Sequence, residues 1–489
     1  MIPILSGNVA TATAPTTYEL ANSCRFNDGD SAYIYRDLGT STAGSGKKFT
    51  FSVWVKRSTI SNADQFILSC GVAASNHLVD LFFQSDDTLK FRLIYNNTLY
   101  GNLTTNAVYR DTASWMHIVI NMDTTQGTAA DRTSMYVNGT KITSFSASTR
   151  PNQDSTFTVN NHTVNSQRIS LGRNEDGTTG YFDGYMAEAI WIDGTTYAAS
   201  NFGEYDEDSP QIWIPKDCKD DLTFGTHGSY LNFQDSGDLD DDESGNGLDF
   251  TATNLAATDQ MTDSPTNNAC TMNPLDNHYG SQTYSEGNLQ IASPSGNASS
   301  PHSTFGLTSG MWYAEAKLSA QGANQTLIGI SSNQSTQADF HLGRGATSYG
   351  LYSSSGAWYT NNGSANAYGV SYTTNDIIGI YLDLDNNKLY FAKNGTIMNS
   401  GTGISITDPA STELGFYFFS GMQWDNATSA TWQWNFGGGS INAISSGNTD
   451  ANGYGNFEYD PSDGGSSSFD SAAKNFLAVN SKNLGSDGG

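Results

Sequence analysis

A chain of 489 residues is too long for one hydrophobic core, so we expect two or three domains. The formal net charge of -27 argues against partners such as nucleic acid or an anionic bilayer, because contacts with phosphate need a basic surface. No apolar run approaches the roughly 20 residues of a membrane span, and abundant small polar residues with 12% aromatics favour all-β domains.

Neither the amino terminus nor the cysteines indicate processing or cross-linking. Residues 1–20 lack a positive stretch and a long apolar core, so we expect an extended N-terminal arm rather than a secretory signal. The cysteines are widely spaced and form no CxxC motif, which predicts free thiols: Cys24, Cys70, Cys218 and Cys270.

Residues 21–203 have the pattern of an antiparallel jelly roll. Apolar and polar side chains alternate along 49–56 and again along 116–122, which predicts strands with one buried and one solvated face. His117 falls on the polar side of the second strand. Asn138-Gly139 tolerates the positive φ of a tight hairpin turn, so a twisted antiparallel sheet is expected.

One short stretch of this domain gathers candidate metal ligands. Asn174, Asp176 and Asp183 supply hard oxygen atoms within ten residues, the ligand type that calcium prefers. We nevertheless expect a capped loop that holds no ion and a protein without a cofactor, with calcium binding as the alternative.

An acidic linker is expected over 204–273. Residues 204–249 hold 14 Asp or Glu against two Lys, and a run of like charge repels itself and is typical of a solvated loop. The spacing of an EF-hand is absent.

The start of this linker raises the question of an enzyme. Glu204, Asp206 and Asp208 alternate, like the carboxylates of some glycoside hydrolases, in which alternate side chains of one strand face the cleft. The third carboxylate is Asp rather than Glu, and Ser209-Pro210 follows at once. We therefore predict no enzyme, with a glycoside hydrolase as the weakest alternative.

Residues 274–438 form the second expected β-sandwich, and 439–489 a Gly/Ser-rich C-terminal segment. Apolar side chains alternate along 378–384, and the chain turns at Asn386-Asn387 into a returning strand. The fold class is thus all-β, with two β-sandwich (jelly-roll) domains in tandem.

The second domain also carries the candidate ligand contacts. Aromatic faces beside amides and carboxylates suit sugar rings, which offer apolar C–H faces and ordered hydroxyls. Two segments concentrate such residues in strands and loops: Tyr352, Trp358, Tyr359 and Asn361, then Trp424 and Asp425. The alternative is that these aromatic residues pack on a sandwich face.

Two families resemble these domains. The strings "KKFTFSVWVKRS", "WMHIVINMDTTQG", "SMYVNGTKI" and "FDGYMAEAIWIDG" follow the order of laminin-G-like, concanavalin A-like jelly rolls. The strings "GMWYAEAKL", "TLIGISSN", "NDIIGIYLDLDNNKLYFAKNGT" and "TWQWNFGG" follow the order of SPRY domains. The resemblance implies binding modules, and SPRY domains bind peptides or other ligands through loops.

Three further segments carry a wider resemblance: "NSCRFNDGDSAYIYRDLG" near the start, "TDSPTNNACTMNPLDN" at 262–277, and the closing segment. Through them nearly the whole chain resembles structural proteins of marine bacteriophages. In that segment a Ser/Gly-rich insertion after Pro461 replaces the compact turn of the group. The resemblance implies a virion protein exposed on the particle surface, as a tail or capsid fibre or a decoration, which adsorbs to host cells.

Two functions stay open. In the first, the loops bind host cell-surface glycans; in the second, the chain decorates or joins parts of the virion and binds only other virion proteins. Display on a symmetric particle favours a homo-oligomer, with a trimer as the expected state.

Overall fold

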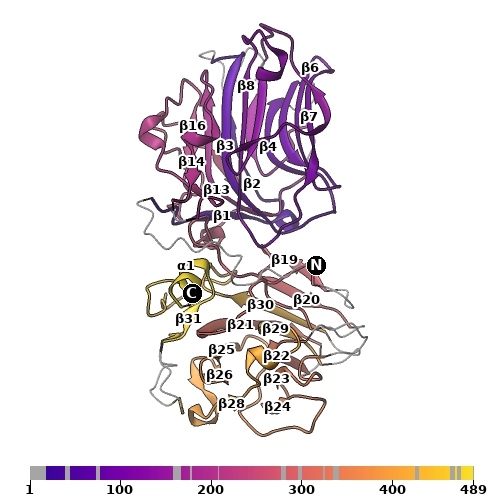
Figure 1. Cartoon of the computed structure of the whole chain (residues 1–489), viewed down its shortest axis with the longest axis vertical. Coiled ribbons are helices and arrows are strands. Elements are labelled where there is room, and N and C mark those ends of the chain that lie inside the picture. Colours follow the sequence, from indigo (N-terminus) through magenta and orange to yellow (C-terminus); the bar gives the residue numbers. More distant parts are fainter. Residues whose placement is uncertain are drawn as a thin grey trace. The chain divides into compact units, whose positions relative to one another are not determined.

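The chain folds into two compact units, residues 14–266 and 267–489. The computed structural model describes residues 18–38, 44–72, 77–157, 167–176, 179–207, 209–276, 282–295, 300–322, 325–333, 341–424, 429–462, 469–470 and 475–487. The fold is all-β as predicted, in several sheets (Figure 1). Within these residues no helix is long and apolar enough to cross a membrane.

The first unit is built on two eight-stranded sheets. One has the order β10-β9-β8-β3-β13-β1-β18, with β16 added on β13: β10 Thr140–Lys141, β9 Thr133–Val137, β8 Met116–Asp123, β3 Lys48–Arg57, β13 Gly184–Asp193, β1 Ser23–Phe26, β18 Gln260–Met261 and β16 Ser229–Leu231. The other has the order β11-β7-β6-β5-β4-β12-β2-β17: β11 Phe145–Thr149, β7 Thr98–Val108, β6 Thr88–Tyr95, β5 His77–Phe83, β4 Gln65–Val72, β12 Arg168–Leu171, β2 Tyr33–Asp37 and β17 Thr251–Thr253.

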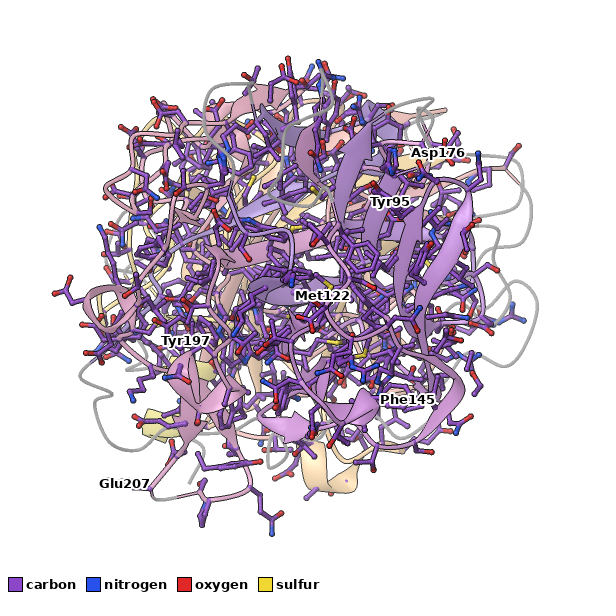
Figure 2. All side chains as sticks on the ribbon, turned by 90° about the horizontal axis from the view of Figure 1, so that it is seen from above. Tyr95, Met122, Phe145, Asp176, Tyr197 and Glu207 are labelled. Atoms are coloured by element: carbon purple, nitrogen blue, oxygen red, sulfur yellow. The ribbon has the colours of Figure 1, made fainter. Side chains whose placement is uncertain are left out.

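The core of this unit lies between the two sheets. Phe49 of β3 stacks on Trp191 of β13 at 4.9 Å between ring centroids, and Phe91 of β6 packs against Phe49 from the other sheet. Met122 of β8, fully buried, lies near the middle of the unit seen from above, whereas Asp176 lies toward its rim (Figure 2). Alternation thus buries one face of each strand.

The prediction that the other face of β3 and β8 is solvated was wrong. All of Phe49–Arg57 and all of β8 are buried. Residues 197–207 and 209–230 cover this face, with Phe202, Cys218 and Tyr230 packed on Val119 and Ile190. The covering segment is irregular and has no periodic pattern in its own sequence. The pattern of the strands alone therefore predicted that their second face contacts solvent.

The expected acidic linker is, over 204–266, part of the first unit. This segment supplies the β14-β15 hairpin, Gly203–Tyr205 with Trp213–Pro215, and also β16, β17 and β18. The run of like charge is ordered because its carboxylates accept main-chain hydrogen bonds. Asp242 accepts from the N–H groups of Tyr230 (2.9 Å), Ser244 (3.0 Å) and Leu248 (3.1 Å).

The second unit pairs a nine-stranded sheet with a four-stranded sheet. The larger has the order β19-β20-β30-β21-β25-β26-β27, with β28 on β26 and β31 on β21: β19 Thr283–Ser285, β20 Gln290–Ser293, β30 Ala430–Asn435, β21 Met311–Gln321, β25 Ile377–Asp383, β26 Lys388–Lys393, β27 Thr396–Ile397, β28 Ile404–Ser405 and β31 Leu477–Ala478. The smaller has the order β24-β23-β22-β29 (Figure 1): β24 Trp358–Tyr359, β23 Ser348–Tyr352, β22 Thr326–Ser331 and β29 Phe418–Gln423.

The described part of the C-terminal segment 439–489 packs into the second unit rather than trailing from it. β31 pairs in parallel with β21, and Phe457 and Phe476 are buried against Tyr313 and Tyr381. The helices of the described residues are short: α1 Ser481–Asp487 and the 3-10 turns η2 Asp28–Asp30, η3 Ala129–Asp131, η5 Ala199–Asn201, η6 Lys219–Asp221, η7 Ala257–Asp259, η8 Met398–Gly401 and η9 Pro409–Ser411.

Candidate functional site

The four-stranded sheet of the second unit carries the candidate site. Leu327 of β22 lies between Tyr352 of β23 and Met422 of β29, so these three side chains share one face. Gly421, the neighbour of Met422, instead points at Trp432 and Trp434 of the larger sheet, where an added Cβ would lie 3.0 Å from the Trp434 ring. One face of the small sheet therefore packs on the large sheet, and the face of Leu327 points away from it.

Four rings gather on this second face, and we call them the aromatic platform: His341, Tyr352, Tyr359 and Trp424. Trp424 is the centre, with ring centroids 4.5 Å from His341, 4.7 Å from Tyr352 and 4.9 Å from Tyr359. All four side chains are half-buried. Leu327, Leu342 and Met422 form the buried base beneath them. The platform thus joins apolar ring surface with indole, imidazole and phenol groups at partial exposure.

A loop at 341–345 holds one side of the platform in place. The Leu342 N–H donates to the Met422 sulfur at 3.2 Å, while the N–H groups of Asn361 and Asn362 donate to the carbonyls of Gly345 and Gly343. The loop crosses the sheet close to Gly350, where an added Cβ would lie 3.1 Å from the Leu342 carbonyl oxygen. Glycine at this position lets the loop bring His341 onto Trp424.

The structure brings together three of the residues predicted to contact a ligand, Tyr352, Tyr359 and Trp424. Trp358 points to the opposite face of β24, where its ring lies 6.0 Å from Tyr349, because adjacent residues of a strand face opposite ways. Asn361 is exposed in a left-handed turn (φ 54°) next to the platform loop. Asp425 lies outside the described residues.

Sequence reasoning did not select His341 or Leu342. Neither lies in a strand, and the positions of His341 on the platform and of Leu342 in its base depend on the loop that crosses β23 and β24. A histidine followed by Leu and Gly carries no local signal for such a crossing.

The three predicted metal ligands differ in their local partners and in their exposure. Asn174 accepts the Asp176 N–H at 2.9 Å in a local turn, and the Asp176 side chain is exposed. Asp183 is buried and accepts a hydrogen bond from the Thr59 hydroxyl. Among the described residues no group of three or more His, Cys, Asp or Glu is placed to hold a metal ion.

Two of the three carboxylates weighed for glycoside hydrolysis are described. Glu204 lies on β14, and Asp206 is buried and accepts the Ser209 N–H at 2.9 Å. Asp208 lies outside the described residues. The Asp206 carboxylate therefore caps a turn.

Comparison with known families agrees with both domains. Residues 28–196 match the concanavalin A-like lectin/glucanases superfamily, and residues 311–436 match the SPRY domain. The chain therefore contains a concanavalin A-like, laminin-G-like domain followed by a SPRY domain.

Individual relatives match over short stretches only. Ran-binding protein 9 of Homo sapiens is 32% identical over 100 residues, which are 20% of this chain and 13% of the relative. Ran-binding protein 10 of Danio rerio is 31% identical over 100 residues, 20% of this chain and 16% of the relative. The matched stretch is thus a small part of each relative's length.

Solved structures overlap weakly with the chain. The SPRY domain of human HERC1 has a TM-score of 0.26 at 16% identity and covers 35% of this chain and 99% of that domain. A protein of Bacteroides ovatus assigned to carbohydrate binding has a TM-score of 0.32 at 14% identity, covering 48% of this chain and 59% of the other.

Proposed function

We propose that the chain is a phage virion surface protein that binds host cell-surface glycans through the aromatic platform. The observation that carries the proposal is the convergence of Tyr352, Tyr359 and Trp424 with His341 on the sheet face that points away from the sandwich core. Half-buried rings offer flat apolar area to the C–H face of a sugar, and the nearby Asn361 amide can bind its hydroxyls.

The virion location rests on the sequence resemblance of residues 22–39, 262–277 and 455–485. Protein displayed in many copies binds weak ligands with avidity, which suits adsorption to a cell surface. We propose a homo-oligomer, a trimer, because closed symmetry matches the axes of a particle. Light scattering during gel filtration of the purified chain tests this state.

Binding of the purified protein to intact host cells and to a glycan array, with and without a calcium chelator, tests the function. The proposal predicts saturable binding that one sugar competes away. Loss of cell and glycan binding in the presence of the chelator would show that this binding depends on calcium. Tight binding to capsid or tail proteins, with none to cells, would contradict glycan binding and leave a structural decoration.

A further inference from the structure

The large sheet of the second unit carries a polar pocket that is separate from the aromatic platform. Along β21, Ala314, Ala316 and Leu318 are fully buried, while the alternate side chains of Glu315 and Lys317 line a pocket of about 320 Å³. The neighbouring strands add Ile377, Gln433 and Asn435 to the lining. The loop after β30 forms the far wall of the pocket.

The C-terminal segment covers only part of this sheet face. The row Tyr313–Tyr381–Tyr390 is covered by Phe457 and Phe476. In the next row, both Glu315 oxygens accept main-chain N–H groups, from Tyr459 at 2.7 Å and Glu458 at 3.0 Å. In the part of the chain that the structure describes, the row of Gln433, Lys317 and Ile377 has no such cover, and it forms the pocket floor.

Hydrogen bonds hold the polar groups of this floor in order. Lys317 Nζ donates to Asn442 Oδ1 at 3.0 Å, Asn442 Nδ2 donates to Gln433 Oε1 at 3.0 Å, and Gln433 Nε2 donates to Gln290 Oε1 at 2.8 Å. Lys317 makes no ion pair with any described carboxylate. Since an ammonium group has three donors, two remain for a ligand.

The lining selects a chemical class. Glu458 and Lys317 both line the pocket, and the Glu458 carboxylate accepts the Ser445 N–H. The pocket therefore holds a negative acceptor and a positive donor. A phosphate or sulfate is disfavoured by Glu458, and an apolar ligand by the amides. Hydroxyl groups both donate and accept, and Ile377 and Ile444 offer apolar surface to C–H groups. The volume lies at the lower end of the range of ligand pockets.

We infer that this pocket binds one neutral sugar residue. Six of its eleven lining residues lie beyond the residues that match the SPRY domain: Ser440, Asn442, Ala443, Ile444, Ser445 and Glu458. This pocket is separate from the aromatic platform, which lies on the other sheet of the unit.

The isoleucine methyl groups of the pocket give a direct readout. The full chain, labelled with ¹³C at isoleucine methyls, is titrated with the methyl glycosides of glucose, galactose, mannose and N-acetylglucosamine, and separately with inorganic phosphate. We expect at least one glycoside to shift the Ile377 and Ile444 signals saturably, with a dissociation constant in the millimolar range, and phosphate not to.

Variants assign the binding to the pocket. Lys317→Met and Gln433→Leu each weaken the saturable shift about tenfold or more, and Ala443→Phe, which adds a ring at the exposed rim of the pocket, abolishes it. Lys388→Met, on the same sheet outside the pocket lining, changes nothing. Trp424→Ala leaves the shifts intact. Loss of sugar binding in the pocket can therefore be told apart from loss of glycan binding at the platform.

Two results would overturn the inference. The first is that no glycoside moves the Ile377 and Ile444 signals, and the second is that phosphate moves them instead.

Discussion

Lys56 Nζ lies 2.8 Å from Asp263 Oδ2, and both side chains are almost completely buried. The other Asp263 oxygen accepts the Trp115 indole N–H at 2.9 Å. The pair joins β3 to the chain that follows β18, so the end of the expected linker is anchored inside the first unit.

Removing one partner of this pair should destabilise the first unit strongly. Asp263→Ala leaves the Lys56 ammonium buried without its carboxylate, which costs about 3–5 kcal/mol of unfolding free energy. Asp154→Ala is the matched control, because Lys47 and Asp154 form an exposed pair (38% and 62%) whose loss should cost less than about 1 kcal/mol. Hydrogen exchange of the β3 amides measures the loss of stability in each variant. Equal protection in the two variants would contradict the view that the Lys56–Asp263 pair anchors the segment after β18.

Glu188 predicts a pH dependence of stability in the first unit. Burial raises its pKa from 4.5 to about 8, while the phenol groups of Tyr18 (2.6 Å) and Tyr230 (3.1 Å) donate to its carboxyl group. Because the folded state holds the proton more tightly, this group's contribution is complete below the unfolded pKa. It is lost as the pH rises toward 8, at up to about 1.4 kcal/mol per pH unit.

Glu188→Gln should remove this slope. The amide stays neutral and can still accept from Tyr18 and Tyr230, so the variant gains stability relative to the native chain as the pH rises from about 5 to about 8. Melting temperatures of the two chains across this range test it. Parallel pH profiles would show that Glu188 does not titrate there.

His117 should stay neutral in acid. It is fully buried, which lowers its pKa to about 3, and its Nδ1 accepts the Trp213 indole N–H at 3.0 Å. The proton therefore sits on Nε2, where it is donated to the Ser52 hydroxyl at 2.8 Å. ¹⁵N NMR should show the Nε2–H tautomer of His117 from neutral pH down to about pH 4. A His117 signal that titrates near the ordinary pKa of histidine would contradict this burial.

The ring of Tyr359, rather than its hydroxyl, should matter for ligand binding. Tyr359→Phe keeps the edge contact with Trp424, so glycan affinity should change less than about threefold, whereas Tyr359→Ala opens the platform and should weaken binding about tenfold. Titration calorimetry with the glycan selected on the array compares the two. Equal losses would place the hydroxyl in the contact instead.

Much of the fold follows from alternation alone. Strands β3, β8 and β25 lie where the alternating pattern predicts them, with Asn138-Gly139 in a turn between β9 and β10. Burial of the second face of β3 could not be predicted, because its cover comes from a segment whose charge and irregular pattern indicate solvent. The covering contacts are long-range and leave no local signal.

The candidate site was predictable in part. A period of two already implies that Trp358 and Tyr359 face opposite ways, but which of them faces the core depends on the pairing of β24 with β23. Tyr359 lies opposite Gly350, beside Tyr352, and so joins the platform. His341 arrives by a loop, and only the tertiary fold places it there.

The aromatic platform is proposed to bind glycans, and two tryptophans test this most directly: Trp358 in β24 and Trp424 just after β29. Trp424→Ala removes the centre of the platform, whereas Trp358→Ala removes a ring from the opposite face. Titration of each folded variant with the array-selected glycan should show at least a tenfold loss for Trp424→Ala and native affinity for Trp358→Ala. Native affinity in Trp424→Ala, or an equal loss in both variants, would contradict the claim.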